Sequence, residues 1–194
     1  AKEAYVVGYD ELNFDYIRFP SDGEISKMRF PYYDSSKKTK SEVIEEFFSY
    51  LHGQIQDIGV PTSADLFGMT TTNTDDLGIG QILEKATPYF DYICPMAYPS
   101  SYPAGWHGFK KPASAPYQIV KLSMDGAVKR LNAQGLPAEK IRPWLQDFNL
   151  GATYTASMIK AEIKAVNDAG LDSWMMWDAS NQYTISAYRQ TVAN

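Results

Sequence analysis

The sequence lacks the residues that several common classes of protein require. It has two histidines and one cysteine in 194 residues, and these show none of the spacings of a zinc site. A single cysteine also excludes an internal disulfide. There is no glycine-rich phosphate loop and no Gly-x-Ser-x-Gly motif, which argues against nucleotide binding and against a serine hydrolase. We therefore expect no metal and no cofactor.

Positive charge and long apolar runs are scarce as well. The 18 Lys and Arg are outnumbered by 23 Asp and Glu, for a formal charge of −5, which argues against a nucleic-acid partner. No apolar run is long enough to span a bilayer. Cys94 lies in the apolar run 92–96 with no histidine nearby, so we expect a buried, unreactive thiol.

Aromatic residues, in contrast, are abundant. They make up 14% of the chain, and 14 tyrosines outnumber nine phenylalanines. A tyrosine offers a flat apolar face and a hydroxyl, which suits sugar binding as well as packing. The length is sufficient for one domain with a sizeable core, so we expect a single domain over residues 1–194.

Segments typical of strands and helices alternate along the chain. Strands are predicted at 11–19, 62–70, 91–98, 141–148 and 173–177, and helices at 1–8, 41–59, 80–90, 116–134, 155–169 and 183–192. Short apolar strands separated by helices predict a parallel sheet with helices outside it. The fold class is therefore α/β, a partial (β/α)8 barrel of the TIM-barrel type with about five units.

Five units are fewer than a closed barrel needs. The first residues already look helical without a start cap, so we expect the chain to be a piece of a longer one. A five-stranded parallel sheet has two open edges. We therefore expect self-association, or completion of the barrel by an N-terminal segment.

Four ordered motifs resemble one family: YDELNFDYIRFP at 9–20, SADLFG at 63–68, CPMAYPS at 94–100 and RPWLQDF at 142–148. This is a bacterial family of predicted glycoside hydrolases with (β/α)8 barrels, classified as a domain of unknown function. The resemblance implies that strands four to eight are present and strands one to three absent. It also implies a carbohydrate substrate, a polysaccharide or a cell-envelope glycan, which would place the full-length protein outside the cytoplasm.

The first motif is also similar to the chitinase strand motif Asp-x-x-Asp-x-Asp-x-Glu. Asp10, Asn13 and Asp15 align with its three aspartates. Ile17 stands where a chitinase has its glutamate acid, and an isoleucine side chain cannot protonate a leaving group. The similarity therefore supports the barrel fold but argues against a chitinase mechanism.

Two aspartates interrupt apolar strands and are the candidate catalytic pair. Asp15 follows the apolar residues of the first strand, and Asp65 lies within the second. Glycosidases need two carboxyl groups, one to protonate the leaving oxygen and one to attack or to activate water. We expect Asp15 to be the nucleophile or base and Asp65 the acid. The alternatives are structural: an Asp15 bound by Arg18 or a backbone amide, and an Asp65 ion pair with Arg18 or Arg142.

The candidate substrate-binding residues lie at or after strand ends. They are Arg18, Tyr98, Trp106, His107, Gln146, Asp147, Trp177, Asp178 and Asn181. Asp147 is also an alternative acid, and Trp177 could form the floor under a reacting sugar. For the loop aromatics, packing over the barrel rim is the alternative. For the chain as a whole, the alternatives to an enzyme are a non-catalytic carbohydrate-binding barrel and an inactive fragment.

Overall fold

The computed structural model describes residues 1–188 as a curled half-barrel. Five parallel strands form one sheet in chain order: β1 (Leu12–Phe14), β2 (Thr62–Phe67), β3 (Tyr92–Met96), β4 (Trp144–Gln146) and β5 (Met175–Trp177). Within the described residues, β1 pairs only with β2 and β5 only with β4, so both edges of the sheet are open. The predicted fold class is confirmed.

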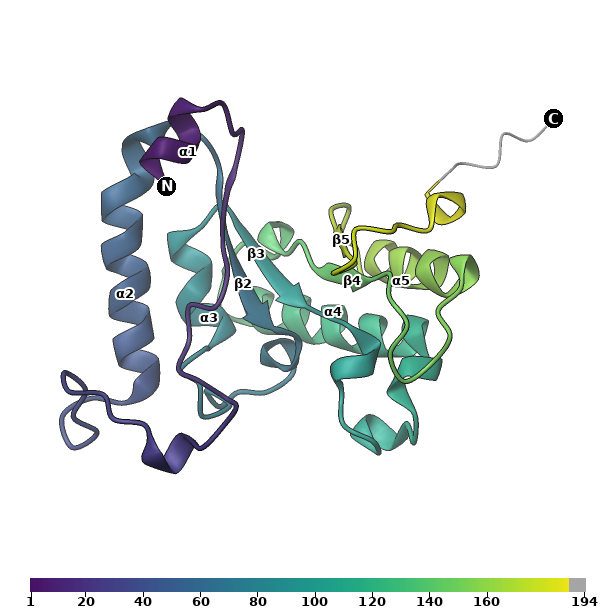
Figure 1. The fold of residues 1–194 in the computed structure, drawn as a ribbon, viewed down its shortest axis with the longest axis horizontal. Helices are drawn as coiled ribbons and strands as arrows, with labels where there is room; N and C mark the ends of the chain where they lie inside the picture. Colours follow the sequence, from purple (N-terminus) through teal and green to yellow (C-terminus); the bar gives the residue numbers. More distant parts are fainter. Residues whose placement is uncertain (189–194) are drawn as a thin grey trace.

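One short helix precedes β1, and the other helices connect successive strands. They are α1 (Lys2–Val6), α2 (Lys40–Ile55), α3 (Leu83–Ala86), α4 (Pro116–Ala133) and α5 (Ala156–Asp168), with short 3-10 turns between them. Figure 1 shows α2 and α3 beside β2 and β3, while α4 and α5 continue toward β4 and β5. In residues 1–188, no helix combines the length and apolar character that a membrane crossing needs.

The strands present one face to the helices and the other to the concave side of the half-barrel. Alternate residues of a strand point to opposite faces. The residues that join the core with the helices include Ala64, Leu66, Ile93 and Leu145. Their sequence neighbours on the same strands therefore face the concave side, where Ser63, Asp65, Cys94 and Trp144 lie. These polar and aromatic positions are where a barrel builds its site.

The helix boundaries follow local capping chemistry. Helix α2 begins after Thr39, whose hydroxyl accepts from the Glu42 amide while the Glu42 carboxylate accepts from the Thr39 amide. This capping box satisfies two amides at the start of the helix, which begins one residue before the predicted start at residue 41. Helix α5 begins after Thr155, as predicted, and its hydroxyl accepts from the Met158 amide.

Most predicted elements are shorter in the structure, and two differ the most. The strand predicted over 11–19 ends at Phe14, because Tyr16 takes a left-handed conformation with φ 58° that no strand can continue. The helix predicted from Tyr183 is, over the described residues, only the 3-10 turn Ile185–Ala187. The rest of that predicted helix, 189–192, lies outside the described residues.

A pair of neighbouring phenylalanines on α2 tests the core assignment. Phe48 is fully buried, whereas Phe47 is 45% exposed. Phe48→Ala should therefore lower the free energy of unfolding by about 3–5 kcal/mol, because it leaves a cavity under the sheet. Phe47→Ala is the matched control and should cost roughly 1 kcal/mol or less. Urea unfolding measures both, and equal losses would contradict the assignment.

Candidate active site

Asp65 is a buried carboxylate on the concave face, near the C-terminal end of β2. It is 5% exposed. Its Oδ1 atom accepts from Asn13 Nδ2 at 2.9 Å and from Trp144 Nε1 at 2.8 Å. Oδ2 accepts from none of residues 1–188 and is not enclosed by them. One oxygen is thus held in place and the other is free to meet a substrate.

The electrostatic environment of Asp65 favours its protonated form. Burial raises its pKa to about 6, and the negative charge of Asp15 adds to the rise. The hydrogen bonds from Asn13 and Trp144 and the charge of Arg142 act in the opposite direction without cancelling it. A carboxyl group that keeps its proton to about pH 6 is suited to donate a proton near neutrality.

Asp15 lies at the same level as Asp65, directly after the neighbouring strand β1. The last paired residues of β1 and β2 are Phe14 and Ala64, and Asp15 and Asp65 follow them directly. Asp15 is exposed, so its expected place within a buried strand was wrong. Its Oδ1 accepts from the Tyr16 amide at 2.7 Å, which is the backbone-amide contact expected as the structural alternative. That bond orients the carboxylate but leaves it in contact with solvent.

Side chains cross the concave face from strand to strand. Trp144 of β4 reaches Asp65 of β2 across the intervening strand β3, where Asp65 pairs with the small residue Cys94. Below them, Arg142 forms an ion pair with Glu11, and Glu11 also accepts from Ser63 Oγ at 2.7 Å. Arg142, one of the two arginines considered as an alternative ion-pair partner of Asp65, therefore pairs with Glu11 instead.

Cys94 is enclosed in this face. It is fully buried, and burial, reinforced by the charge of Asp65, raises the pKa of its thiol to about 12. The predicted buried, unreactive thiol is confirmed. In residues 1–188 no three His, Cys, Asp or Glu side chains come together as a potential metal site.

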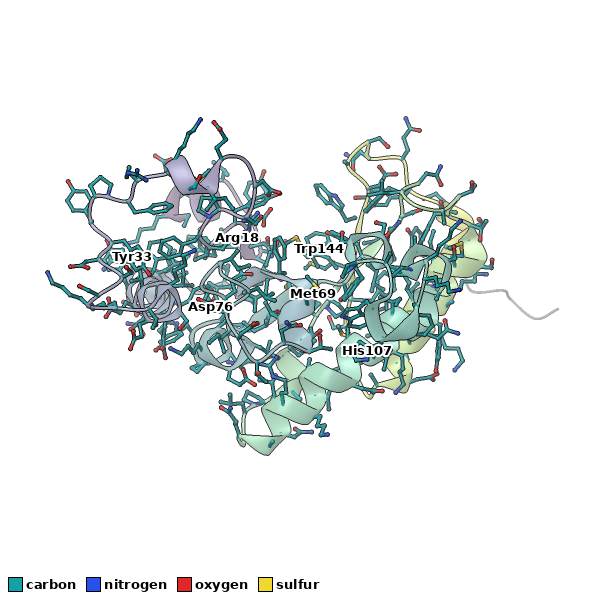
Figure 2. All side chains as sticks on the ribbon, turned by 90° about the horizontal axis from the view of Figure 1, so that it is seen from below. Arg18, Tyr33, Met69, Asp76, His107 and Trp144 are labelled. Carbon is teal, nitrogen blue, oxygen red and sulfur yellow. The ribbon has the colours of Figure 1, made fainter. Side chains whose placement is uncertain are left out.

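A cleft of about 250 Å³ opens at the C-terminal ends of β2 and β3. Its lining residues come from the segments that follow β1, β2 and β3: Tyr16, Arg18, Asp22, Phe67, Gly68, Met69, Met96, Tyr98, Ser101 and Tyr102. A Cβ atom on Gly68 would lie 2.4 Å from the Met96 carbonyl oxygen, so only glycine fits this wall. In Figure 2, Arg18 and Trp144 are seen on either side of Met69.

Tyr98 links the cleft to the two carboxylates. It lines the cleft and packs edge-on against Phe148, with ring centroids 5.5 Å apart. Burial raises the pKa of its hydroxyl, and the charges of Asp65 and Asp15 raise it further. Tyr98 therefore keeps a neutral hydroxyl within the electrostatic influence of both carboxylates.

The residues around β5 form the far side of the concave face. Trp177 is 42% exposed and packs edge-on against Trp144, with centroids 5.9 Å apart. Trp174 packs against the helix-side core instead. Asp178 accepts from the amide and hydroxyl of Ser180, and Asn181 occupies an exposed turn with φ 61°. Of the three residues predicted here, Trp177 is the one that contacts Trp144, which in turn donates to Asp65.

Gln146 and Asp147 are both buried and both make structural hydrogen bonds. Gln146 accepts from the Ser100 amide at 3.1 Å and donates to the Phe148 carbonyl at 2.9 Å. The carboxylate of Asp147 accepts from the amide and hydroxyl of Thr184, each at 2.7 Å, and from the Tyr188 hydroxyl. These contacts match the loop-capping alternative, and they hold the segments after β3 and β5.

The aromatic loop after β3 is divided between the cleft and its outer support. Tyr102 lines the cleft, is buried, and its hydroxyl lies 2.7 Å from Ser123 Oγ. Trp106 packs on Tyr102 with centroids 4.5 Å apart, and His107 packs on Trp106 at 4.2 Å. Neither Trp106 nor His107 lines the cleft, which matches the packing alternative.

Sequence reasoning missed several residues of the site. Asn13 and Trp144 hold Asp65, and Phe67 and Tyr16 line the cleft. Glu162 of α5 is a fully buried carboxylate that accepts from the Gln146 amide at 2.8 Å. Burial raises the pKa of Glu162 well above its usual range. Asn13 could have been found from strand alternation with Asp15, whereas the contact of Trp144 depends on the curl of the sheet.

The family model described as "Putative glycosyl hydrolase domain" matches residues 1–183. The chain belongs to this family. The match covers nearly all of the sequence, so the family resemblance that the four motifs indicated is confirmed. Among proteins of curated function, no sequence matches the chain.

Solved structures of glycoside hydrolases share the fold of this family member. The chitinase from Chromobacterium violaceum superposes with a TM-score of 0.60 at 14% identity, over 96% of this chain and 68% of that one. The spore cortex-lytic enzyme SleL from Bacillus megaterium gives 0.59 at 12%, over 96% and 49%. The PgaB glycoside hydrolase domain from Bordetella bronchiseptica gives 0.52 at 15%, over 72% and 37%. The chain thus spans about a third to a half of the last two structures.

The raised pKa of Asp65 predicts a specific pH dependence of stability. Its pKa is about 6 when folded, against 3.8 for the free side chain, so charging Asp65 opposes folding. This cost is absent below pH 3.8 and develops as the pH rises to about 6. Asp65→Asn should therefore raise the free energy of unfolding at pH 7 by on the order of 3 kcal/mol and change it little at pH 3.5.

Urea unfolding between pH 3.5 and 8 measures this difference. Asp57→Asn, an exposed aspartate at the opposite ends of the strands, is the control and should show no such trend. A difference between Asp65→Asn and wild type that stays constant with pH would contradict the raised pKa.

Proposed function

We propose that this chain forms a glycoside hydrolase site that acts on a polysaccharide or a cell-envelope glycan through Asp65 and Asp15. One observation carries the proposal: a buried, hydrogen-bonded carboxyl group whose pKa is about 6 lies one strand away from a solvent-exposed carboxylate, beside an aromatic cleft. Two carboxyl groups in unlike environments are what acid and nucleophile roles require.

The environments of the two carboxyl groups indicate their roles. Burial of Asp65 favours its protonated form, and the unbonded Oδ2 can donate that proton to the leaving oxygen. Asp15 is exposed and oriented by the Tyr16 amide, so it serves as nucleophile or as the base that activates water. Asn13 and Trp144 fix the angle of Asp65 from two other strands.

The aromatic residues supply the surface for the sugar. Tyr16, Phe67 and Tyr98 line the cleft, and the exposed edge of Trp177 continues the concave face beyond Trp144. Flat apolar rings with few polar groups between them suit the faces of sugar rings. Membership of the glycosyl hydrolase family and the shared fold support the same reaction class.

Activity on a panel of glycans tests the two carboxylates. Asp15→Asn and Asp65→Asn should each lower kcat by about 100-fold or more, since each removes an acid–base or nucleophilic group. Asp57→Asn is the control and should keep wild-type activity, and circular dichroism checks that all three fold. Unchanged turnover in either site variant would remove that residue from the mechanism. Glycan binding without turnover by wild type would indicate a non-catalytic binding barrel.

The pH profile separates the two roles. Because the acid must be protonated, activity should fall as the pH rises through about 6, the pKa of Asp65. Initial rates measured between pH 4 and 9 would show this fall in activity. A rate that still increases above pH 7 would assign the acid to another group.

We also propose that the open sheet edges are covered in solution, by a second copy of the chain or by a segment that completes the barrel. β1 and β5 each leave one edge unpaired among the described residues, and unpaired strand edges promote association. Sedimentation velocity of this chain alone should therefore show a species larger than 21.8 kDa. A monodisperse monomer would contradict this.

A further inference from the structure

Arg18 occupies an unusual position in the wall of the cleft. Its guanidinium lies 4.8 Å from the centroid of the Phe67 ring and 5.1 Å from that of Tyr16. Nη1 donates to the Phe19 carbonyl at 3.2 Å and to Ser21 Oγ at 3.1 Å. These contacts hold the flat group in place from one edge and from its aromatic neighbours.

The other edge of the guanidinium is not used by the described chain. Nε is buried and has no hydrogen-bond partner, and Nη2 donates to none of residues 1–188 while remaining accessible. No carboxylate of the described residues lies within ion-pair distance of Arg18. A half-buried cation without a counter-ion loses hydration and gains no ionic contact in return.

The other partly buried arginines among the described residues are paired differently. Arg130 forms an ion pair with Glu84 at 2.5 Å, and Arg142 forms one with Glu11. The side chains of Arg130 and Arg142 are each 14% exposed, and neither residue lines the cleft. Among residues 1–188, Arg18 is thus the one arginine that lines the cleft, and no carboxylate of these residues forms an ion pair with it.

We propose that Arg18 is a binding residue for an anionic substituent, a carboxylate carried by a sugar of the bound glycan. The substrate class is then an acidic glycan, built from uronic acids or from sugars with an acidic side group. The guanidinium is fixed by two hydrogen bonds of Nη1 and lies near two aromatic rings, so the accessible N–H groups of Nη2 have a fixed direction and can donate to a carboxylate oxygen. This inference rests on the glycosidase function proposed above and narrows its substrate.

Asp22 limits how close the anion can come to one side of the cleft. It lines the same cleft, and its Oδ2 accepts from the Ser21 hydroxyl at 2.7 Å. Its negative charge disfavours an anion nearby, so the carboxylate is expected on the Phe67 and Tyr98 side of Arg18. Removing the charge with Asp22→Asn should therefore strengthen the binding of an acidic glycan.

Paired glycans test the proposal. Calorimetry would compare oligogalacturonate, hyaluronan and alginate oligosaccharides, and glycan strands from peptidoglycan, each with its carboxyl-reduced counterpart. Asp15→Asn protein would be used to prevent turnover. For at least one pair, the carboxylate form should bind tenfold or more tightly than the reduced form. Arg18→Gln should abolish that preference and leave the affinity for the reduced form unchanged.

Further variants separate charge recognition from a structural role. Arg18→Lys keeps the charge without the planar group and should retain only part of the preference. Arg29→Gln removes an exposed arginine that donates only to the Ser26 and Met28 carbonyls, and it should change nothing. In the wild type, the side-chain ¹⁵N signal of Arg18 should shift on addition of D-glucuronate and not of D-glucose.

The outcomes distinguish this proposal from the function on which it rests. Binding of acidic and reduced forms with equal affinity would overturn the acidic-glycan proposal and leave the glycosidase function intact. If Arg18→Gln lowers the affinity for the acidic and the reduced glycan equally, the acidic-glycan proposal is also overturned, because Arg18 then has a structural role. If wild type binds none of the glycans, both proposals fail.

Discussion

The hydrogen bond from the indole of Trp144 to Asp65 defines the geometry on which the rest of this site depends. It joins β4 to β2, which are not neighbours, so it can form only if the sheet curls over β3. The ion pair of Arg142 with Glu11 spans the face in the same way, from the start of β4 to the start of β1. Both contacts place polar partners inside the curve, where each would be costly alone. The curvature of the sheet therefore depends on this hydrogen bond and this ion pair, and both contacts can form only if the sheet is curved.

This mutual dependence explains why Asp65 is held by several contacts while Asp15 is not. Asp65 is enclosed because three strands converge on it, and enclosure raises its pKa. Asp15 follows a strand of only three residues that has a partner on one side, so it remains in contact with water. The difference between the two carboxyl groups arises from the openness of the β1 edge as much as from their sequence neighbours.

The fold could be predicted from the sequence because its periodicity is local. Apolar strands, capped helices and stop glycines such as Gly135 and Gly170 are each visible within a few residues, and the five strands appear in the predicted order. Strand lengths were overestimated, since the apolar run 11–19 continues into a left-handed turn that composition does not reveal. Phe19 is buried in the core although it lies beyond the strand.

The site was less predictable because its decisive contacts are distant in sequence. Asp65 stood out as an acid within an apolar strand, but its partner Trp144 is 79 residues away. Gln146 and Asp147 are polar residues at a strand end and were therefore predicted to bind substrate. Their polar atoms instead form hydrogen bonds with the loops after β3 and β5. A carboxylate at the end of a strand can face a cleft or a loop, depending on the path of the chain segment that follows the strand. Tertiary packing determines that path.

The enclosure of Cys94 has a practical consequence for studying the protein in solution. The thiol is the single one in the chain, lies under the Asp65 network, and has a pKa of about 12. Thiol-reactive probes act on the accessible thiolate, so the native chain behaves toward them as if it had no cysteine. Spin labels or fluorophores can then be attached to single cysteines introduced on β1 and β5. Their separation would report how far the two open edges of the half-barrel move apart or close.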